Sequence, residues 1–210
     1  MNKFGIGQPV RRVEDQRFIT GRGRYVDDID LPRQLYGALV MSTHAHARIK
    51  GINTAKAKAA PGVVEVLMHV EAAADKVGAL PPVMPEDMGG PKGYRSMRPL
   101  LVGGDIRAVG DRVAFVLAET EEQARAAAEL VEIDYEPLPV VVSIEDAVKP
   151  GAPAIWDDCP GNVSFTLMFG NKDATDAAFA KAKHTVSLKL DNNRINANAI
   201  EPRAAIGEYH

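Results

Sequence analysis

The sequence predicts an α+β fold, and three observations support this class. Strand-length apolar runs alternate along the chain with short alanine-rich segments of helical character. One strand–helix–strand unit, residues 112–135, favours parallel or crossover pairing and hence an α+β or α/β core. Segments rich in proline and glycine separate the units, so we expect the helices and strands to be short.

The chain begins with an arm and continues into strands. The first 34 residues are rich in glycine, proline and charge, and we expect an extended arm that needs another surface to become ordered. The continuously apolar run "LYGALVMS" predicts a strand that is buried on both faces. "ARIKGI" alternates as a half-buried strand does. Thr54 is then expected to cap a short helix, "AKAKAA", which Pro61 and Gly62 end.

Two further elements precede a long irregular segment. "VVEVLM" is rich in β-branched residues and predicts a strand, and "VEAAADKV" predicts a helix. Residues 78–104 are rich in proline, glycine and methionine and show no apolar period. Such a segment is typical of a binding loop, an inter-subunit contact or a disordered stretch, with a plain solvated loop as the alternative.

The unit that follows is the clearest in the chain. "RVAFVLAE" predicts a strand, and "EEQARAAAEL" predicts a helix with alanines on its packing face. Thr120 and Gln123 have the spacing of a capping box at the start of this helix. "VEIDY" is the returning strand, with Val131, Ile133 and Tyr135 on one face.

The last quarter of the chain predicts a linker and a second unit. "KPGAPAIWDDCPG" is expected to cross the surface, held there by Trp156. "NVSFTLMFG" and "HTVSLKLDN" predict two strands on either side of a helix, "DATDAAFAKAK", that Asp173 caps. The final residues alternate as a strand that has no partner in this chain. Because unpaired strand edges are unfavourable, we expect further polypeptide after His210.

Composition excludes several classes of protein. A formal net charge of −3 gives no general attraction to nucleic acid or anionic lipid. The single cysteine, Cys159, excludes an intrachain disulfide and any multi-thiolate zinc or iron–sulfur site, and it fits a cytoplasmic location. The N-terminus lacks the apolar region of a signal peptide, and no apolar run approaches the roughly 20 residues that span a bilayer.

A pair of histidines is the first candidate site. In "STHAHARI", His44 and His46 lie two residues apart, which places both imidazoles on one face of a strand, as metal chelation requires. The other histidines, His69, His184 and His210, have no spacing that supplies a third ligand. A structural or interface role is therefore favoured over a metal site. No nucleophile or oxyanion motif accompanies the pair, so a proton shuttle lacks its other groups.

Three other motifs are weaker candidates. The glycines of "GRGRY" and "VGGD" complete no phosphate-binding loop. The carboxylates of "YVDDID" could bind a cation or transfer a proton, but a solvated acidic turn is the default. Acidic neighbours raise the pKa of a thiol, which disfavours Cys159 as a nucleophile. By residue chemistry alone, the chain has no self-sufficient active site.

Five stretches, in this order, carry a resemblance to a known family. They are "GQPVRRVEDQRFITGRGRYVDDIDLPRQLYGALVMSTHAHARI", "PGVVEVL", "RPLLVGGDIRAVGDRVAFVLAET", "AAELVEIDYEPLPVVVSIEDAV" and "NAIEPRAAIGEY". With them the chain resembles the N-terminal part of the molybdopterin-binding large subunit of the xanthine dehydrogenase, aldehyde oxidase and aerobic carbon monoxide dehydrogenase family. The resemblance extends over nearly all of the sequence.

The resemblance implies a domain organisation and an activity. Residues 1–19 would be an extended arm, 20–136 an α/β hammerhead domain, 137–160 a linker, and 161–210 the incomplete beginning of a molybdopterin-binding α+β domain. Members of the family are oxidoreductases that oxidise carbon monoxide or hydroxylate aldehydes and N-heterocycles at a molybdenum–molybdopterin site, with oxygen from water. Electrons leave through [2Fe–2S] clusters to FAD on partner subunits or domains.

The loops that hold molybdenum in this family come after the "EPRAAIGEY" segment, as does the glutamate thought to act as base. We therefore assign no catalytic residue and no metal ligand to this chain, and its cofactor-binding residues stay unknown. The leading hypothesis is a scaffold with subunit contacts that is inactive by itself. Its partners would be the remainder of the large subunit or a second large-subunit chain, an iron–sulfur small subunit and an FAD medium subunit, in a homo- or hetero-oligomer.

Two other hypotheses compete with this one. The first is a stand-alone hammerhead module for binding or assembly, without redox activity, that uses residues 78–104. The second and least favoured is a small metal enzyme built on His44 and His46.

Overall fold

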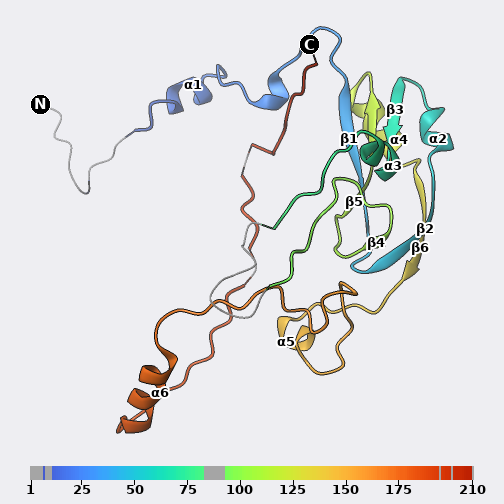
Figure 1. Cartoon of the computed structure of the whole chain (residues 1–210). Helices are drawn as coiled ribbons and strands as arrows, with labels where there is room; N and C mark the ends of the chain where they lie inside the picture. Colours follow the sequence, from blue (N-terminus) through green and yellow to red (C-terminus); the bar gives the residue numbers. More distant parts are fainter. Residues whose placement is uncertain (1–6, 8–10, 83–92, 194, 200, 210) are drawn as a thin grey trace, which may run out of the picture. The chain divides into compact units, whose positions relative to one another are not determined.

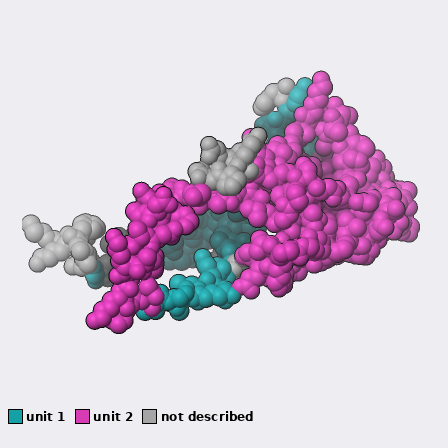
Figure 2. Space-filling model, turned by 60° about the horizontal axis from the view of Figure 1, so that its bottom comes forward, with its two compact units in different colours: residues 1–34, 186–210 teal, residues 35–185 magenta. Residues whose placement is uncertain are grey.

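The computed structural model describes residues 7, 11–82, 93–193, 195–199 and 201–209 (Figure 1). The chain divides into two compact units, coloured in Figure 2. One comprises Met1–Gln34 with Val186–His210, and the other is Leu35–Thr185. Part of the irregular segment predicted at 78–104 lies outside the described residues.

Two small antiparallel sheets form the second unit. Sheet A has the order β1-β5-β3, with β1 at Tyr36–Met41, β5 at Arg112–Ala118 and β3 at Val63–Leu67. Sheet B has the order β4-β2-β6, with β4 at Asp105–Ile106, β2 at Ala47–Asn53 and β6 at Glu132–Pro137. With the helices described below, these sheets confirm the predicted α+β class.

The prediction of parallel or crossover pairing within residues 112–135 was wrong. Helix α4, Glu121–Ala128, connects β5 of sheet A to β6 of sheet B, so the two strands are not neighbours. Each pairs instead with a strand from far earlier in the chain: Leu39 of β1 faces Phe115, and Ile52 of β2 faces Ile133. Pairings of such long range leave no local signal in the sequence.

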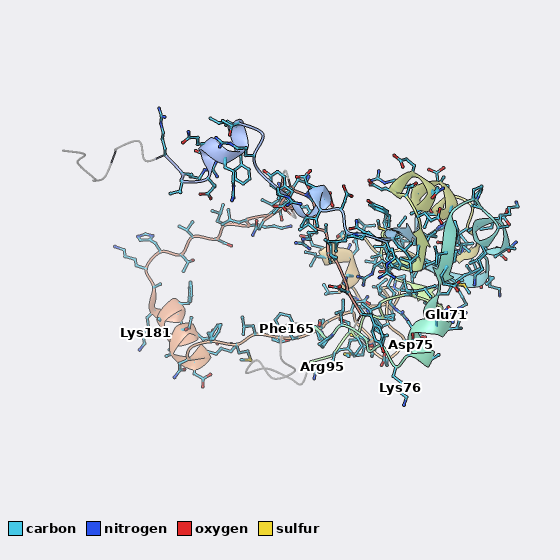
Figure 3. The ribbon with its side chains drawn as sticks, turned by 90° about the horizontal axis from the view of Figure 1, so that it is seen from above. Glu71, Asp75, Lys76, Arg95, Phe165 and Lys181 are labelled. Atoms are coloured by element: carbon cyan, nitrogen blue, oxygen red, sulfur yellow. The ribbon has the colours of Figure 1, made fainter. Side chains whose placement is uncertain are left out.

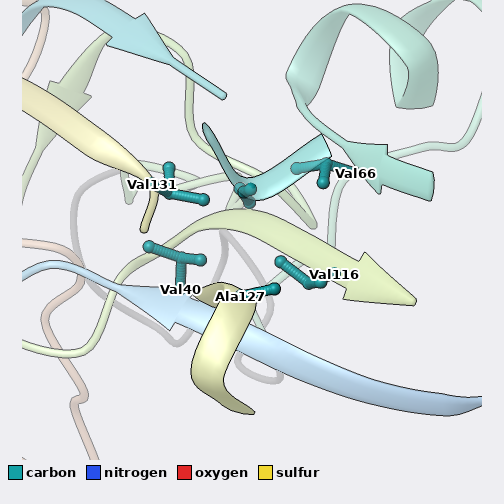
Figure 4. Packing of buried hydrophobic residues seen from close by; sticks show 7 residues of the cluster. Val40, Val66, Val116, Ala127 and Val131 are labelled. Carbon is teal, nitrogen blue, oxygen red and sulfur yellow. The ribbon is translucent and has the colours of Figure 1, made fainter. Parts of the chain in front are cut away.

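The hydrophobic core lies between sheet A and helix α4, and the sequence predicted this helix and the three strands of the sheet. Val40, Val66, Val116, Ala127 and Val131 are buried together (Figure 4). Small alanines let the helix approach the sheet closely. A second buried cluster belongs mainly to sheet B and the segments beside it, and consists of Ala47, Val102, Ile106 and Val113.

The capping box of α4 is confirmed. The Gln123 backbone N–H donates to Thr120 Oγ1 at 3.2 Å, and the Thr120 backbone N–H donates to Gln123 Oε1 at 3.1 Å. These two bonds satisfy backbone donors that the first turn of a helix leaves free. The Gln123 side chain also packs on Gly62, whose φ of +75° suits the turn before β3.

Strand β1 differs from its prediction, because it is buried on one face only. Val40 is 9% exposed, whereas its neighbours Leu39 and Met41 are 42% and 54% exposed. Helix α4 contacts the face that carries Val40, and the opposite face of β1 stays open. The central strand β5 is far more buried, with Val113, Ala114, Val116 and Ala118 all at 0%.

The short helices are capped by residues other than those predicted. Helix α2, Ala55–Lys58, begins after Thr54 as expected, but Asn53 Oδ1 accepts the bond from the Ala55 N–H, at 3.1 Å. Helix α3, His69–Ala74, is confirmed, and Glu71 accepts from the Met68 N–H. Helix α5, Ile144–Ala147, lies in the expected linker and was not predicted.

The two strands predicted around the last helix were wrong. Helix α6, Lys172–Lys181, is present, but Asn171 Oδ1 caps it by accepting from Ala174 N–H, so Asp173 is not the cap. The described residues on either side form no strand in the two sheets, and Phe169 and Leu188 are 88% and 77% exposed. Alternating apolar residues become a strand only beside a partner strand. Figure 3 labels Phe165 and Lys181 in this stretch.

The arm of the first unit contains short helices rather than extended chain alone. Helix α1 is Asp15–Ile19, and a 3₁₀ turn, η1, is Val26–Asp28. The rings of Phe18 and Tyr25 stack at 5.5 Å, and the Phe18 ring lies over Gly23, where a Cβ would be 2.3 Å from it. Among the described residues, no helix is long and apolar enough to cross a membrane.

Candidate functional site

The two candidate histidines lie in the turn between β1 and β2, in residues 42–46, which we call the histidine turn. Ser42 is 2% exposed and organises this turn. Its N–H donates to the Asp111 carbonyl at 2.8 Å, and its carbonyl accepts from the Gly110 N–H at 2.8 Å. Its Oγ accepts from the His44 N–H at 3.0 Å. The turn is therefore tied to the residues just before β5.

The two imidazoles are engaged in different contacts. The His46 side chain is buried, and its Nδ1 donates to the Pro139 carbonyl at 2.6 Å, since a carbonyl oxygen can only accept. The His44 ring lies against Tyr135, with ring centroids 4.5 Å apart and planes at 33°. Each histidine thus holds the turn against β6 or the segment that follows it.

Neither histidine has the neighbours that a metal site needs. Over the part of the chain that the structure describes, no group of three or more His, Cys, Asp or Glu side chains could hold a metal ion. Zinc sites need three or four protein ligands. Among the described residues, His44 and His46 are therefore not part of a cluster that could hold a zinc-like metal ion.

A second polar cluster fastens the segment after β6 to the sheets. We call it the tryptophan clasp, and it comprises Tyr94, Arg107, Trp156 and Asp158. The Arg107 guanidinium lies 4.0 Å from the centroid of the Trp156 ring, and its Nε donates to the Ile155 carbonyl at 2.9 Å. The Tyr94 hydroxyl donates to Asp158 Oδ1 at 2.7 Å. The expectation that Trp156 holds this segment down is confirmed.

Two weak acids, Tyr94 of the clasp and the neighbouring Cys159, are stabilised in their neutral forms. Burial, and then the hydrogen bond to Asp158, raise the pKa of Tyr94 from 10.0 to about 12. Burial also raises the pKa of the Cys159 thiol, and the Asp158 carboxylate adds to that effect. Both groups are protonated near neutral pH, so neither is an activated nucleophile.

Two aspartates away from the histidines have structural roles, and one of them belongs to a motif of the sequence. In "YVDDID", Asp28 Oδ2 accepts from the Tyr25 N–H at 2.9 Å and so closes the turn η1. Asp111 Oδ2 accepts from the N–H groups of Arg107 and Ala108, which shapes the turn before β5. Sequence reasoning missed Tyr94 and Arg107 altogether. They are distant from Trp156 along the chain, and no motif connects them.

An open groove of about 630 Å³ runs beside the histidine turn, between β1, α4 and β6. Its lining is mostly apolar and includes Leu39, Met41, Val131 and Tyr135, with Thr43 from the turn. The charged side chains at this groove are Arg125 of α4 and Glu129, the residue that follows α4.

Fold and site together define a class: an α+β module of two antiparallel sheets whose notable side chains hold turns and segments in place. Residues 20–139 match the family described as aldehyde oxidase and xanthine dehydrogenase, a/b hammerhead domain. The chain belongs to this family, and the resemblance found in the sequence is confirmed.

Relatives of known function match over almost the whole chain. The carbon monoxide dehydrogenase large chain of Afipia carboxidovorans is 39% identical over 209 residues, which is 94% of this chain and 25% of that protein. The nicotine 6-hydroxylase large subunit of Paenarthrobacter nicotinovorans is 34% identical over 207 residues, with 97% and 24% covered. The chain therefore spans about a quarter of the length of these relatives.

Solved structures agree with the fold. Carbon monoxide dehydrogenase from Oligotropha carboxidovorans superimposes with a TM-score of 0.68 and 39% identity, over 86% of this chain and 23% of that one. Quinoline 2-oxidoreductase from Pseudomonas putida 86 gives a TM-score of 0.66 and 38% identity, over 77% and 20%. The similar proteins are oxidoreductases, and several of them are subunits of larger enzymes.

Proposed function

We propose that this chain is the N-terminal portion of the molybdenum-containing large subunit of a hydroxylase or dehydrogenase. The reaction would be of the carbon monoxide dehydrogenase type, or the oxidation of an aldehyde or N-heterocycle. One observation carries the proposal: the chain matches relatives along nearly its full length but spans only a quarter of theirs. Redox chemistry would then be completed by other polypeptide.

The proposed role of this segment is to support the enzyme and to make subunit contacts. We propose an arm at 1–19, the hammerhead domain at 20–136, a linker at 137–160, and the beginning of the molybdopterin-binding domain at 161–210. No residue of the segment is proposed to be catalytic or a metal ligand. The contacts of His44 and His46 support this, because they hold a turn in place.

The complete enzyme would contain molybdenum–molybdopterin, with [2Fe–2S] clusters and FAD on partner subunits. Molybdenum is named for a similar structure, a Cu,Mo-containing carbon monoxide dehydrogenase. An iron–sulfur small subunit and an FAD medium subunit are the partners we propose, in the cytoplasm. Several relatives are named as a large chain or as a subunit of a complex, which supports a multi-subunit assembly.

Purification of the tagged chain from its native host tests this function. We expect a complex that contains molybdenum, iron, flavin and polypeptide matching the rest of a large subunit, and that reduces an artificial electron acceptor with one of the three substrate classes. The isolated 210-residue chain is expected to show no turnover. A stable monomer without any of these partners would instead favour a stand-alone binding module.

A further inference from the structure

The segment 186–190 carries a row of apolar side chains that the described chain leaves uncovered. In "VSLKL", apolar and polar residues alternate. Val186 is 93% exposed, Leu188 77% and Leu190 80%. We call these three side chains the apolar row. The segment belongs to neither sheet, and Figure 1 draws it as an extended trace beyond helix α6.

The alternation places the apolar row on one side of the segment. Successive side chains of an extended chain point to opposite sides. Ser187 and Lys189 therefore lie on the side opposite the apolar row. This pattern is typical of a segment that rests with one side on an apolar surface and keeps the other side in water. A segment with water on both sides gains nothing from such alternation.

The described part of this chain does not supply the covering surface. Residues 186–193 are exposed throughout, whereas apolar residues of the central strand β5, such as Val113 and Val116, are fully buried. Single exposed apolar residues are ordinary on protein surfaces, but a contiguous exposed group is typical of an interaction surface. The apolar row is therefore expected to meet polypeptide from elsewhere.

The relatives indicate where that polypeptide belongs. Two of them match 94% and 97% of this chain, which leaves out too few residues at either end to exclude 186–190. The same matches span only 25% and 24% of the length of those relatives. Those relatives therefore contain this segment together with a much longer polypeptide.

The rest of a large subunit is the ligand that these observations favour. We propose that the apolar row packs against apolar side chains in the part of the large subunit outside these 210 residues. A second copy of this chain is a poorer ligand, because stable interfaces between separate chains bury about 1,200–2,000 Å², far more than three aliphatic side chains provide. The rest of a large subunit would meet this chain over further surface as well. This inference rests on the proposed function, which supplies that polypeptide.

Thiol labelling at two adjacent positions tests the proposal. Leu188→Cys places a thiol in the apolar row, and Ser187→Cys places one on the opposite side. We expect the thiol at 188 to react about tenfold more slowly in the native complex than in the isolated chain, and the thiol at 187 to react equally in both. The unsubstituted chain, whose Cys159 is 6% exposed, gives the background. Equal rates at 188 in both samples would overturn the proposal. So would slow labelling at 188 in an isolated chain that dimerises, because a second copy would then be the ligand.

A second pair of variants places a charge at the same two positions. Leu188→Asp puts a carboxylate in the apolar row, and Ser187→Asp puts it on the side that faces water. Neither change touches a described buried residue, so the two sheets should fold in both variants. We expect Leu188→Asp to reduce the large-subunit polypeptide recovered with the tagged chain about tenfold, and Ser187→Asp to leave it unchanged.

The outcomes separate this inference from the function on which it rests. Full recovery with Leu188→Asp would overturn the inference and leave the proposed function intact. Absence of the large-subunit polypeptide from the wild type would contradict the proposed function itself, and the inference with it.

Discussion

At the scale of single residues, the notable side chains hold segments of the chain in place rather than assemble a reaction site. His46 donates to a backbone carbonyl, the tilted His44 ring packs against Tyr135, and the Arg107 guanidinium lies over the Trp156 ring. Each of these contacts joins segments far apart in the sequence. The effects of substitution should therefore appear in stability and in the attachment of segments, before they appear in any reaction.

Tyr94 makes stability depend on pH in the alkaline range. Its folded pKa, about 12, lies above the ordinary value of 10.0, so folding favours the protonated phenol. The stability this provides is complete below pH 10 and is lost as the pH rises from 10 toward 12. We expect Tyr94→Phe to weaken that loss, measured as urea midpoints at successive pH values. Tyr209→Phe, at a residue that is 99% exposed, is the control and should keep the wild-type profile.

Arg107 should not be replaceable by lysine. Its planar guanidinium stacks on Trp156 and donates to the Ile155 carbonyl, and an ammonium reproduces neither geometry well. We expect Arg107→Lys to lower the free energy of unfolding by about 1–2 kcal/mol in urea titrations. Arg125→Lys alters an exposed ion pair with Glu121 and should cost less than about 0.5 kcal/mol. Equal effects of the two variants would argue against a role for the clasp.

At the scale of helices and strands, the sequence predicted most of the features that depend on residues close together in the chain. The capping box at Thr120 and Gln123 was found from spacing alone, because both partners lie within one turn. The strands at 63–67 and 112–118 were found from their apolar residues. The strands expected on either side of α6 were wrong, because a strand depends on a neighbour that the local sequence does not specify.

The cap of α6 can be tested directly. Asn171 accepts from the Ala174 N–H at 2.9 Å, whereas Asp173 lies inside the first turn. We expect Asn171→Ala to cost about 1 kcal/mol of local helix stability, seen as roughly fivefold faster amide exchange in α6. Asp173→Ala should have a smaller effect, through the helix dipole alone. Because α6 has no buried residue, neither change should alter the global unfolding midpoint. A larger effect of Asp173→Ala than of Asn171→Ala would instead support Asp173 as the cap, as the sequence predicted.

At the scale of the whole molecule, the described core belongs to one of the two units. Every buried residue in the described ranges lies between Val40 and Cys159, within the unit Leu35–Thr185. Residues 186–193, 195–199 and 201–209 are exposed throughout. The cooperative stability of the chain should therefore come from the sheets and α4.

Removal of residues 186–210 tests this distribution of stability. We expect the thermal unfolding midpoint to change by less than about 2 °C, because the deletion removes no described buried residue. A matched deletion of 131–137 removes Val131 and strand β6 and should abolish cooperative unfolding. Calorimetry distinguishes the two outcomes. A fall of more than about 5 °C after the first deletion would show that the C-terminal segment contributes to the core.

The sequence by itself determined the fold class, most of the helix and strand positions, the capping of α4, and the family through its ordered motifs. These follow from periodicity and from contacts between near neighbours in the chain. Only the tertiary structure decided that β5 and β6 belong to different sheets, that Arg107 and Tyr94 meet the Trp156 segment, and that Leu39 of β1 is 42% exposed. The physical reason is range: strand pairing, stacking and burial depend on residues brought together from distant parts of the chain.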